Sequence, residues 1–364
     1  MTTEAAPGPD GPGAAPGGAL PQGSVLAQGS TRHDIGLYVA EGATGPTVGM
    51  VLHRVLARSA RAFLLNDLNE EVLDRQRRRQ PTGASGHGGY DRPAWAQTAT
   101  ERNDKAARRA SEFDRIHQSR VALRRIRSTL RTFRLAVDPA WGTALRAELA
   151  WYAGVLGETR DLHIIEELIR DKGPKVLSRA NVDRLDAVLA DQRARVAVAL
   201  NAERGGARRF QLTEQMMVLW DGPHFNSKAG LAANEALPAM VQRAWHDLRG
   251  AARTARKQPT EVNLHALRIR LKDLRYGCET VALVEGGPAK KTAKAAERLQ
   301  TKLGDVHDAR FCVDWLRAVG NERPELAEPV EALVSVEREA AADARKGWKR
   351  ELKEVERRWR SWQV

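Results

Sequence analysis

Cysteine is scarce in this sequence, since only Cys278 and Cys312 occur among 364 residues. Two cysteines cannot form a disulfide framework, which argues against a small secreted scaffold and suits a reducing cytoplasm. Long apolar runs are also missing, and no uninterrupted stretch has the length that spans a bilayer. The N-terminal segment MTTEAAPGPDGPGAAPGG lacks the basic and apolar regions of a signal peptide. We therefore expect a cytoplasmic protein.

Several enzyme motifs are absent as well. The sequence contains no GxxxxGK[ST] phosphate-binding loop, no GxSxG nucleophile turn and no HExxH zinc motif. The alternation of apolar and polar residues that indicates half-buried strands is not evident anywhere. We therefore expect a helical protein that is not an enzyme and that needs neither a cofactor nor a metal.

Positive charge, in contrast, is abundant. The chain has 59 Lys and Arg residues against 46 Asp and Glu, which gives a formal net charge of +13. Glu4 and Asp10 are the only charged residues in the first 31, so the basic excess belongs to the rest of the chain. Such an imbalance predicts a polyanionic partner or an anionic surface, and it says nothing about the fold.

The pattern of apolar residues predicts an all-α chain. Gly, Pro and Ala dominate the beginning, so residues 1–46 are expected to be a disordered tail and lead-in. Helical spacing begins in 47–73, and a Gly-rich stretch at 81–93 predicts a loop. Further helical patterns cover 140–156, 161–172, 177–203, 229–254, 260–285, 289–303, 308–319 and 326–360. Gly-Pro and Gly-Gly pairs, such as Gly173-Pro174, separate the patterns.

One predicted helix has an unusual charge pattern. Residues 115–134 carry seven arginines and no acidic residue, and Ser111 is a plausible N-cap for this helix. Exposed helices usually mix signs, because opposite charges at i,i+4 support a helix and like charges weaken it. A helix with one sign of charge therefore predicts an anion supplied from outside. The alternative is a solvated face that happens to be rich in arginine.

The basic motif occurs twice. The residues His117, Arg120, Arg124 and Arg127 form the first basic row, and the residues His265, Arg268, Lys272 and Arg275 form the second basic row, 148 positions later. The segment LGETRD at 156–161 likewise matches LGDVHD at 303–308, 147 positions later. Two motifs at nearly the same offset predict two homologous halves, 47–204 and 229–364.

The spacing within a row has a physical meaning. Steps of 0, 3, 7 and 10 residues place four side chains within an arc of about 80° on a helix. Apolar residues of the first helix face away from that arc and are expected to pack in a core: Leu123, Ile126, Leu130 and Phe133. Two such rows from related halves are expected to converge on one cleft and to focus positive charge on a long anion.

With these residues the chain resembles the CHAD family, the conserved histidine α-helical domain. The resemblance rests on HQSRVALRRIRSTLRTF, on LHALRIRLKDLRY and on the segments LGETRD and LGDVHD, and it covers nearly everything from residue 47 to 364. It implies two bundles of about four helices each, related by a pseudo-twofold axis around a central basic channel, and binding of inorganic polyphosphate. It places the polyphosphate contacts on the two basic rows. We add six further candidates: Arg125, Arg131, Arg54, Arg58, Lys302 and Arg310.

The remaining residues of the motifs have more than one interpretation. His117 and His265 lie near helix starts, where the helix dipole disfavours an imidazolium, whereas a bound polyphosphate would favour it. Asp161 and Asp308 follow a glycine, and we predict that each is a structural N-cap at a break between two helices, or that it also orients an arginine of a basic row. Asp273 stands in the second half where Arg125 stands in the first, which predicts a weaker second half.

Two other functions are alternatives to polyphosphate binding. A nucleic-acid-binding protein would need stacking aromatics among its cations, and Tyr276 is the single candidate beside the rows, so nucleic acid is expected to compete only weakly. The dipeptide His307-Asp308 suggests an HD-type metal-dependent phosphohydrolase, but further ligands are missing from the matching segment. We predict non-catalytic binding of polyphosphate, with no membrane partner, in the cytoplasm or at polyphosphate granules. Granule targeting and regulation are both open as its purpose.

Overall fold

The fold is described by a computed structural model that covers residues 45–67 and 112–362. These residues all belong to one compact unit, Ile35–Val364. Within the two ranges there is no strand, and two isolated bridges, Thr47 to Ala232 and Val137 to Phe225, are the only extended pairings. The all-α prediction is therefore confirmed. The predicted tail as far as residue 44, the Gly-rich loop and the Ser111 cap lie outside the described residues.

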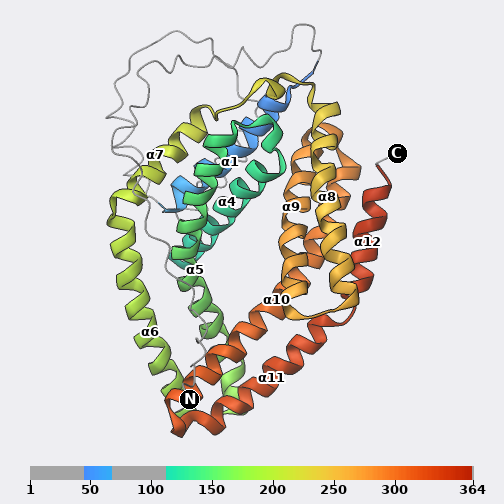
Figure 1. Cartoon of the computed structure of the whole chain (residues 1–364). Helices are drawn as coiled ribbons and strands as arrows, with labels where there is room; N and C mark the ends of the chain where they lie inside the picture. The colour runs from blue at the N-terminus through green and yellow to red at the C-terminus, as the bar shows by residue number, and fades with distance from the viewer. Residues whose placement is uncertain (1–44, 68–111, 363–364) are drawn as a thin grey trace, which may run out of the picture. The chain divides into compact units, whose positions relative to one another are not determined.

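Ten α-helices are described, and Figure 1 shows their arrangement. In chain order they are α1 (Val48–Asp67), α4 (Glu112–Thr132), α5 (Pro139–Val176), α6 (Arg179–Gly205), α7 (Ala207–Asp221), α8 (Ala233–Lys257), α9 (Glu261–Glu285), α10 (Gly287–Glu322), α11 (Ala327–Arg345) and α12 (Trp348–Arg360). The two basic rows lie on α4 and α9, and the segments LGETRD and LGDVHD lie on α5 and α10. Among these helices, none is long and apolar enough to cross a membrane.

Two predicted breaks between helices are wrong, because Gly157 lies inside α5 and Gly304 lies inside α10, so each of these two pairs of predicted helices is one continuous helix. The break predicted at Gly173-Pro174 is present a few residues later, since α5 ends at Val176 and α6 begins at Arg179. A glycine in a helix interior costs about 1 kcal/mol relative to alanine, which neighbouring packing can offset. Gly157, Gly173 and Gly304 are all buried, and the packing against them decides their conformation.

Two other differences concern a predicted helix that is divided and a helix that was not predicted. The pattern predicted over 326–360 is divided at Gly347, whose φ of 78° lies in the left-handed region that favours glycine, so that α11 and α12 are separate helices. Helix α7 was not predicted at all. Its buried apolar residues Leu212, Met216 and Leu219 belong to an apolar core, but the sequence ARRFQLTEQMMVLWD has only a weak helical period.

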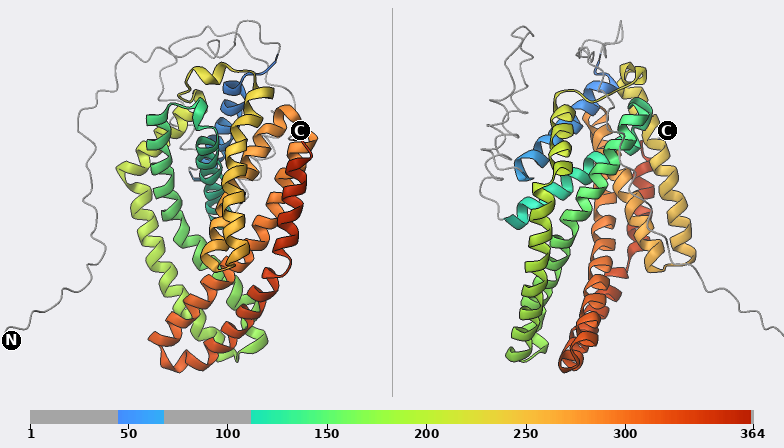
Figure 2. Two further views of the ribbon diagram at one scale, coloured as in Figure 1. Left: turned by 45° about the vertical axis from the view of Figure 1, so that its right-hand side comes forward. Right: turned by 60° about the vertical axis from the view of Figure 1, so that its left-hand side comes forward.

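Three apolar cores hold the helices together. The first joins α1, α4, α5 and α7 and includes Leu123, Ile126 and Leu130, whereas Phe133 joins the second core, formed by α8, α9, α10 and α12. All four side chains are at most 2% exposed, which confirms that the apolar side of α4 is core. The third core joins the later parts of α5 and α10 to α6 and α11, so it contains residues of both sequence halves. Figure 2 shows the helices from two further sides.

Helices α4 and α9 contact each other, and a glycine allows their close approach. A β-carbon at Gly277 in α9 would lie 3.3 Å from Cγ2 of Thr132 in α4 and 3.2 Å from Cγ2 of Val241 in α8. A larger residue at this position would therefore push the helices apart. The contact brings the helix of the first basic row against the helix of the second.

Candidate anion-binding site

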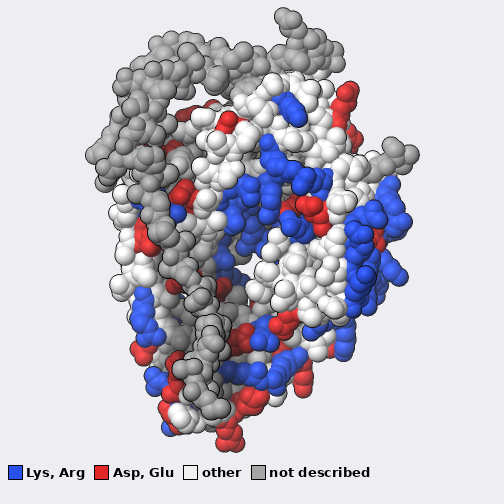
Figure 3. Space-filling model, viewed as in Figure 1, with Lys and Arg blue, Asp and Glu red and all other residues white. Residues whose placement is uncertain are grey.

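The two basic rows lie on the partly exposed sides of α4 and α9. All eight side chains of the rows are half-buried. The opposite side of α4 is fixed in the core by Leu123 and Ile126, which sets the direction of the row. Figure 3 shows Lys and Arg side chains gathered on this face, where α4 and α9 lie in Figure 1.

Cations of the two halves share one region around Lys272. Burial lowers the pKa of Lys272 to about 7, and the guanidinium groups of Arg124, Arg268 and Arg120 act in the same direction. Burial also lowers the pKa of Arg268, and Arg124 of the other helix contributes to this shift. The basic residues of α4 and α9 are therefore close enough to repel one another.

Acidic groups do not neutralise most of these cations. Within the described ranges, five members of the rows have no carboxylate at ion-pair distance: Arg120, Arg124, Arg127, Arg268 and Lys272. Burial lowers the pKa of Arg120 and Arg127, as it does for Arg268. Half-buried cations without a counter-charge destabilise the free protein, and an anion placed between them would relieve that cost.

One arginine in each row lies against the glycine of the neighbouring helix. The Nη1 group of Arg120 donates a hydrogen bond of 3.0 Å to the carbonyl oxygen of Leu156. A β-carbon at Gly157 would lie 3.1 Å from this Nη1, and a β-carbon at Gly304 would lie 3.1 Å from Nη2 of Arg268. The glycines of LGETRD and LGDVHD thus make room for a guanidinium group.

The acidic residues of the same segments do not cap helices. Asp161 and Asp308 lie inside the continuous helices α5 and α10, so the prediction that they are N-caps is wrong. Burial lowers the pKa of Arg120 and of Arg268, and Asp161 and Asp308 partly oppose these shifts. Burial raises the pKa of Asp161, and Asp308 of the other half adds to the shift. Each aspartate therefore acts electrostatically on the arginine of its own half.

The surroundings of both histidines of the rows disfavour the protonated imidazole in the free protein. Burial lowers the pKa of His117, and so do Arg160, Arg124 and Arg120. Burial and the neighbouring His307 lower the pKa of His265, and the centroids of these two rings are 4.7 Å apart. The Nδ1 atom of His265 is buried and has no described hydrogen-bond partner.

The HD dipeptide has few neighbours of the kind that bind metals. In the part of the chain that is described, no group of three or more His, Cys, Asp and Glu side chains is placed to hold a metal ion. Besides burial, Arg268 lowers the pKa of His307, and Lys272 contributes to the same shift. The surroundings of His307 are therefore rich in positive charge.

Two other predicted ligands form ion pairs between α4 and α9. Arg125 pairs with Glu279 at 2.6 Å, and Arg131 pairs with Asp273, which also accepts a 2.9 Å hydrogen bond from Ser128. The pairs are equivalent in the repeat, because 125 and 273 differ by 148 positions, as do 131 and 279. The first half supplies both cations and the second half both acids. The charge of Asp273 is thus paired with that of Arg131 in the first half, and the expectation of a weaker second half stays a prediction.

The last predicted residues are exposed on α1 or have partners other than the cations around Lys272. Arg275 contacts Glu279 at 2.8 Å and Glu297 at 2.6 Å. The others are placed as follows: Arg54 and Arg58 are exposed on α1, the Nζ group of Lys302 donates to the carbonyl oxygen of Lys346, and Arg310 pairs with Asp314. Lys302 and Arg310 thus contact groups that lie outside the two basic rows.

Three further residues contribute to the site, and none of them was predicted as a contact of the anion. Arg160 lowers the pKa of His117, and Arg146 lowers that of Arg127. His307 contacts His265. The repeat itself contained a signal for two of them, because Arg160 and His307 are equivalent positions in LGETRD and LGDVHD. Arg146 has no such signal, since it comes from another part of α5.

The fold and the paired basic helices define a class of helical proteins with a repeated motif, and the family model for the CHAD domain matches residues 96–317. This match covers more than half of the chain, which therefore belongs to the CHAD domain family. It shares 30% identity over 226 residues with Uncharacterized protein MT2285 and Uncharacterized protein Rv2226, both from Mycobacterium tuberculosis. The aligned region is 57% of this chain and 40% of each relative, so this chain spans well under half the length of either protein.

Two solved structures share the fold. PptA from Streptomyces chartreusis superposes with a TM-score of 0.60 at 20% identity, over 85% of this chain and 100% of that chain. The CHAD domain from the plant Ricinus communis gives a TM-score of 0.58 at 18% identity, over 86% of this chain and 92% of that chain. At these identities the likeness extends to the fold alone.

Proposed function

We propose that this protein binds linear inorganic polyphosphate between its two basic rows and does not alter it chemically. One observation carries the proposal: cations from α4 and α9 lie together, half-buried, without described acidic partners. The CHAD family is linked with polyphosphate and triphosphate binding in general, which agrees with this assignment. Binding would place the protein wherever polyphosphate collects, including its granules.

The side chains of the rows suit phosphate. A guanidinium group is planar and holds two phosphate oxygens at once, whereas an ammonium group acts as a point charge. Arg120 and Arg268 are fixed against glycines, so less side-chain entropy is lost when they bind. Lys272 adds a charge that an arriving anion would stabilise, because the anion favours the protonated amine.

Polyphosphate fits this region better than nucleic acid does. Single-stranded nucleic acids are bound by aromatic side chains that stack on the bases, in addition to cations. Tyr276 is buried, and the guanidinium groups of Arg125 and Arg275 lie 5.5 and 5.4 Å from its ring centroid. Its ring faces are therefore already occupied. A chain of phosphates needs no such platform.

A competition experiment tests this proposal. Polyphosphate of defined length and single-stranded DNA of matched charge would be titrated into the protein at two salt concentrations, with binding measured by calorimetry. We expect polyphosphate to bind more tightly at both salt concentrations. Equal or tighter binding of DNA would show that the protein is a nucleic-acid-binding protein.

The proposal that the protein does not hydrolyse polyphosphate is tested separately. Polyphosphate and ATP would be incubated with the protein and Mg²⁺ or Mn²⁺, and orthophosphate release would be followed. We expect no release above the rate without protein. Steady release that disappears in His307→Ala would instead support a metal-dependent phosphohydrolase.

A further inference from the structure

A second group of cations, separate from the basic rows, lies on α10 and α12. These helices run antiparallel, since Trp362 after the end of α12 donates a 3.0 Å hydrogen bond to Thr292 near the start of α10, whereas Glu351 approaches Arg298 at 3.8 Å. We call the exposed cations of α12 and of the first part of α10 the outer basic face: Lys290, Lys291, Lys294, Arg298, Lys349, Arg350, Lys353, Arg357 and Arg360. Figure 3 shows Lys and Arg side chains gathered where α12 lies in Figure 1.

Helix α12 divides its residues sharply between core and solvent. All five of its exposed residues are Lys or Arg. Lys349, Lys353, Arg357 and Arg360 fall within an arc of about 80° at 100° per residue. The opposite side is apolar and buried, formed by Trp348, Leu352, Val355 and Trp359. The solvent side thus offers charge and no apolar group that could insert into a bilayer.

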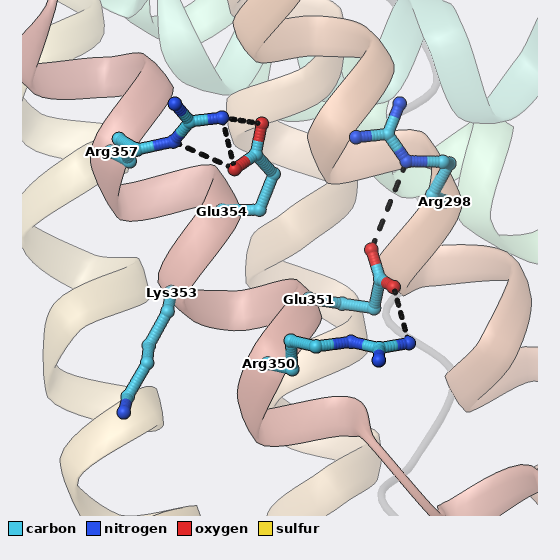
Figure 4. A pocket seen from close by; sticks show the side chains of 6 residues that line it. All are labelled: Arg298, Arg350, Glu351, Lys353, Glu354 and Arg357. Carbon is cyan, nitrogen blue, oxygen red and sulfur yellow. Dashed lines mark hydrogen bonds and ion pairs between the residues drawn. The ribbon is translucent and has the colours of Figure 1, made fainter.

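A groove follows the line between α10 and α12. It has a volume of about 520 Å³ and is lined by Arg298, Arg350, Glu351, Lys353, Glu354 and Arg357 (Figure 4). Glu351 lies 3.8 Å from Arg298 and 3.9 Å from Arg350. Glu354 pairs with Arg357 at 2.7 Å. Two carboxylates therefore orient three arginines and leave positive charge in excess.

Lys353 adds further charge to the groove. Figure 4 shows its side chain pointing away from both groups of paired residues. No described acid lies at ion-pair distance from it. The groove consequently combines arginines held in position with a lysine that is available to an anion.

We propose that this groove and the outer basic face form a second contact surface for a linear chain of phosphates. The inference rests on the proposed function, because it assigns the same ligand to both surfaces. Helices in contact have axes about 8–10 Å apart, so a groove between them admits a single chain and not a duplex. The exposed side of α12 also has no aromatic residue that could stack on a base.

The two surfaces are near each other. Arg275, the last residue of the second basic row, pairs with Glu297 of α10, and the next residue, Arg298, lines the outer groove. Helix α10 contacts both α9 and α12. A long chain bound between the rows would therefore have a high effective concentration at the outer groove, and a short chain would not reach it.

Chain length provides the test. The double variant Lys353→Glu/Arg357→Glu would be compared with Arg184→Glu/Arg195→Glu, which makes the same change of charge at exposed positions of α6. Affinities for a short polyphosphate and for one several times longer would be measured by calorimetry. We expect the outer variant to lose about tenfold or more in affinity for the long chain only, as avidity predicts. The α6 variant is expected to bind both chains like the unmodified protein.

A second double variant guards against misfolding. Lys290→Glu/Lys294→Glu lies on the α10 side of the outer basic face and removes no described ion pair. It is expected to show the same selective loss, with an unchanged circular dichroism spectrum. An equal loss for short and long chains, or no loss for either, would overturn the second surface while the proposed function stands.

Two further outcomes are informative. If neither chain binds to the unmodified protein, the proposed function itself fails. If duplex DNA binds and only its binding is lost in Lys353→Glu/Arg357→Glu, the outer basic face serves nucleic acid, and our inference is wrong.

Discussion

The guanidinium group of Arg120 in α4 lies against Gly157 in α5, so closely that a β-carbon on the glycine would stand 3.1 Å from Nη1. Arg268 and Gly304 repeat this relationship between α9 and α10. The glycine in each of the segments LGETRD and LGDVHD is thus explained by the arginine side chain that lies against it. A helix tolerates the glycine because a neighbouring side chain occupies the space.

Gly157→Ala is expected to change polyphosphate affinity and helix stability in opposite directions. The new methyl group would displace the flexible end of Arg120, and polyphosphate affinity is expected to fall. The helix itself would gain, because alanine in a helix interior is favoured over glycine by about 0.5–1 kcal/mol. Calorimetric titration and urea unfolding would measure the two effects.

Gly154→Ala is the matched control for this variant. Gly154 lies in the same helix, and nothing lies within 4 Å of a β-carbon there. It is expected to gain stability without any change in affinity. Equal affinities of the two variants would show that the position of Arg120 does not matter for binding.

Charge reversal in either basic row should weaken binding. Arg124→Glu and Lys272→Glu each remove a central cation and add a repulsive charge, so both are expected to lower affinity more than the corresponding alanine variants. Each lost phosphate contact should reduce the slope of log affinity against log salt by somewhat under one unit, by analogy with nucleic acids. Affinity would be measured across salt concentrations.

Arg195→Glu controls for the total charge. Arg195 is exposed on α6 and has no described ion pair, unlike Arg193, which pairs with Glu166 at 2.6 Å. We expect Arg195→Glu to have little effect. A loss as large as that of Arg124→Glu would mean that the protein is merely basic.

The ion pairs between α4 and α9 should contribute to stability. Asp273→Ala leaves Arg131 and Ser128 without their common acceptor, and Asp273 is only 5% exposed. We expect a loss of about 2 kcal/mol in the free energy of unfolding, measured in urea. Arg125→Ala, at a more exposed pair, is expected to cost less, and the reverse order would contradict the importance of the buried carboxylate.

Polyphosphate affinity should fall as the pH rises above 7. The pKa of Lys272 is lowered to about 7 in the free protein, and a bound anion would raise it, so binding takes up a proton above that pH. The affinity is then expected to decrease by up to about tenfold per pH unit until the pKa of the complex is reached. Below pH 7 the amine is already protonated, and this contribution is constant.

Lys272→Arg tests the assignment of this pH dependence. An arginine stays charged throughout this range, so the decrease between about pH 7 and about pH 9 should largely disappear in the variant. Titrations at several pH values would compare the two proteins. An unchanged slope in Lys272→Arg would assign the dependence to another group.

Much of the fold was readable in the sequence because it depends on local periodicity. Leu123 and Ile126 recur at helical spacing and are buried, as predicted. The helix ends predicted at the glycines were wrong for a physical reason. Gly157 reads locally as a helix end, but its role is set by Arg120, which lies 37 positions away in the chain.

In the candidate site, too, some features follow from the local sequence and others depend on distant residues. The sequence by itself determined that α4 and α9 each carry a row of cations on one side, because spacing alone fixes the side of a helix. Only the tertiary structure decided which cations have partners. Arg124 and Arg125 are adjacent arginines, yet Arg125 pairs with Glu279 and Arg124 has no described acid beside it. Acids from distant segments determine the difference, since charges interact through space and not along the chain.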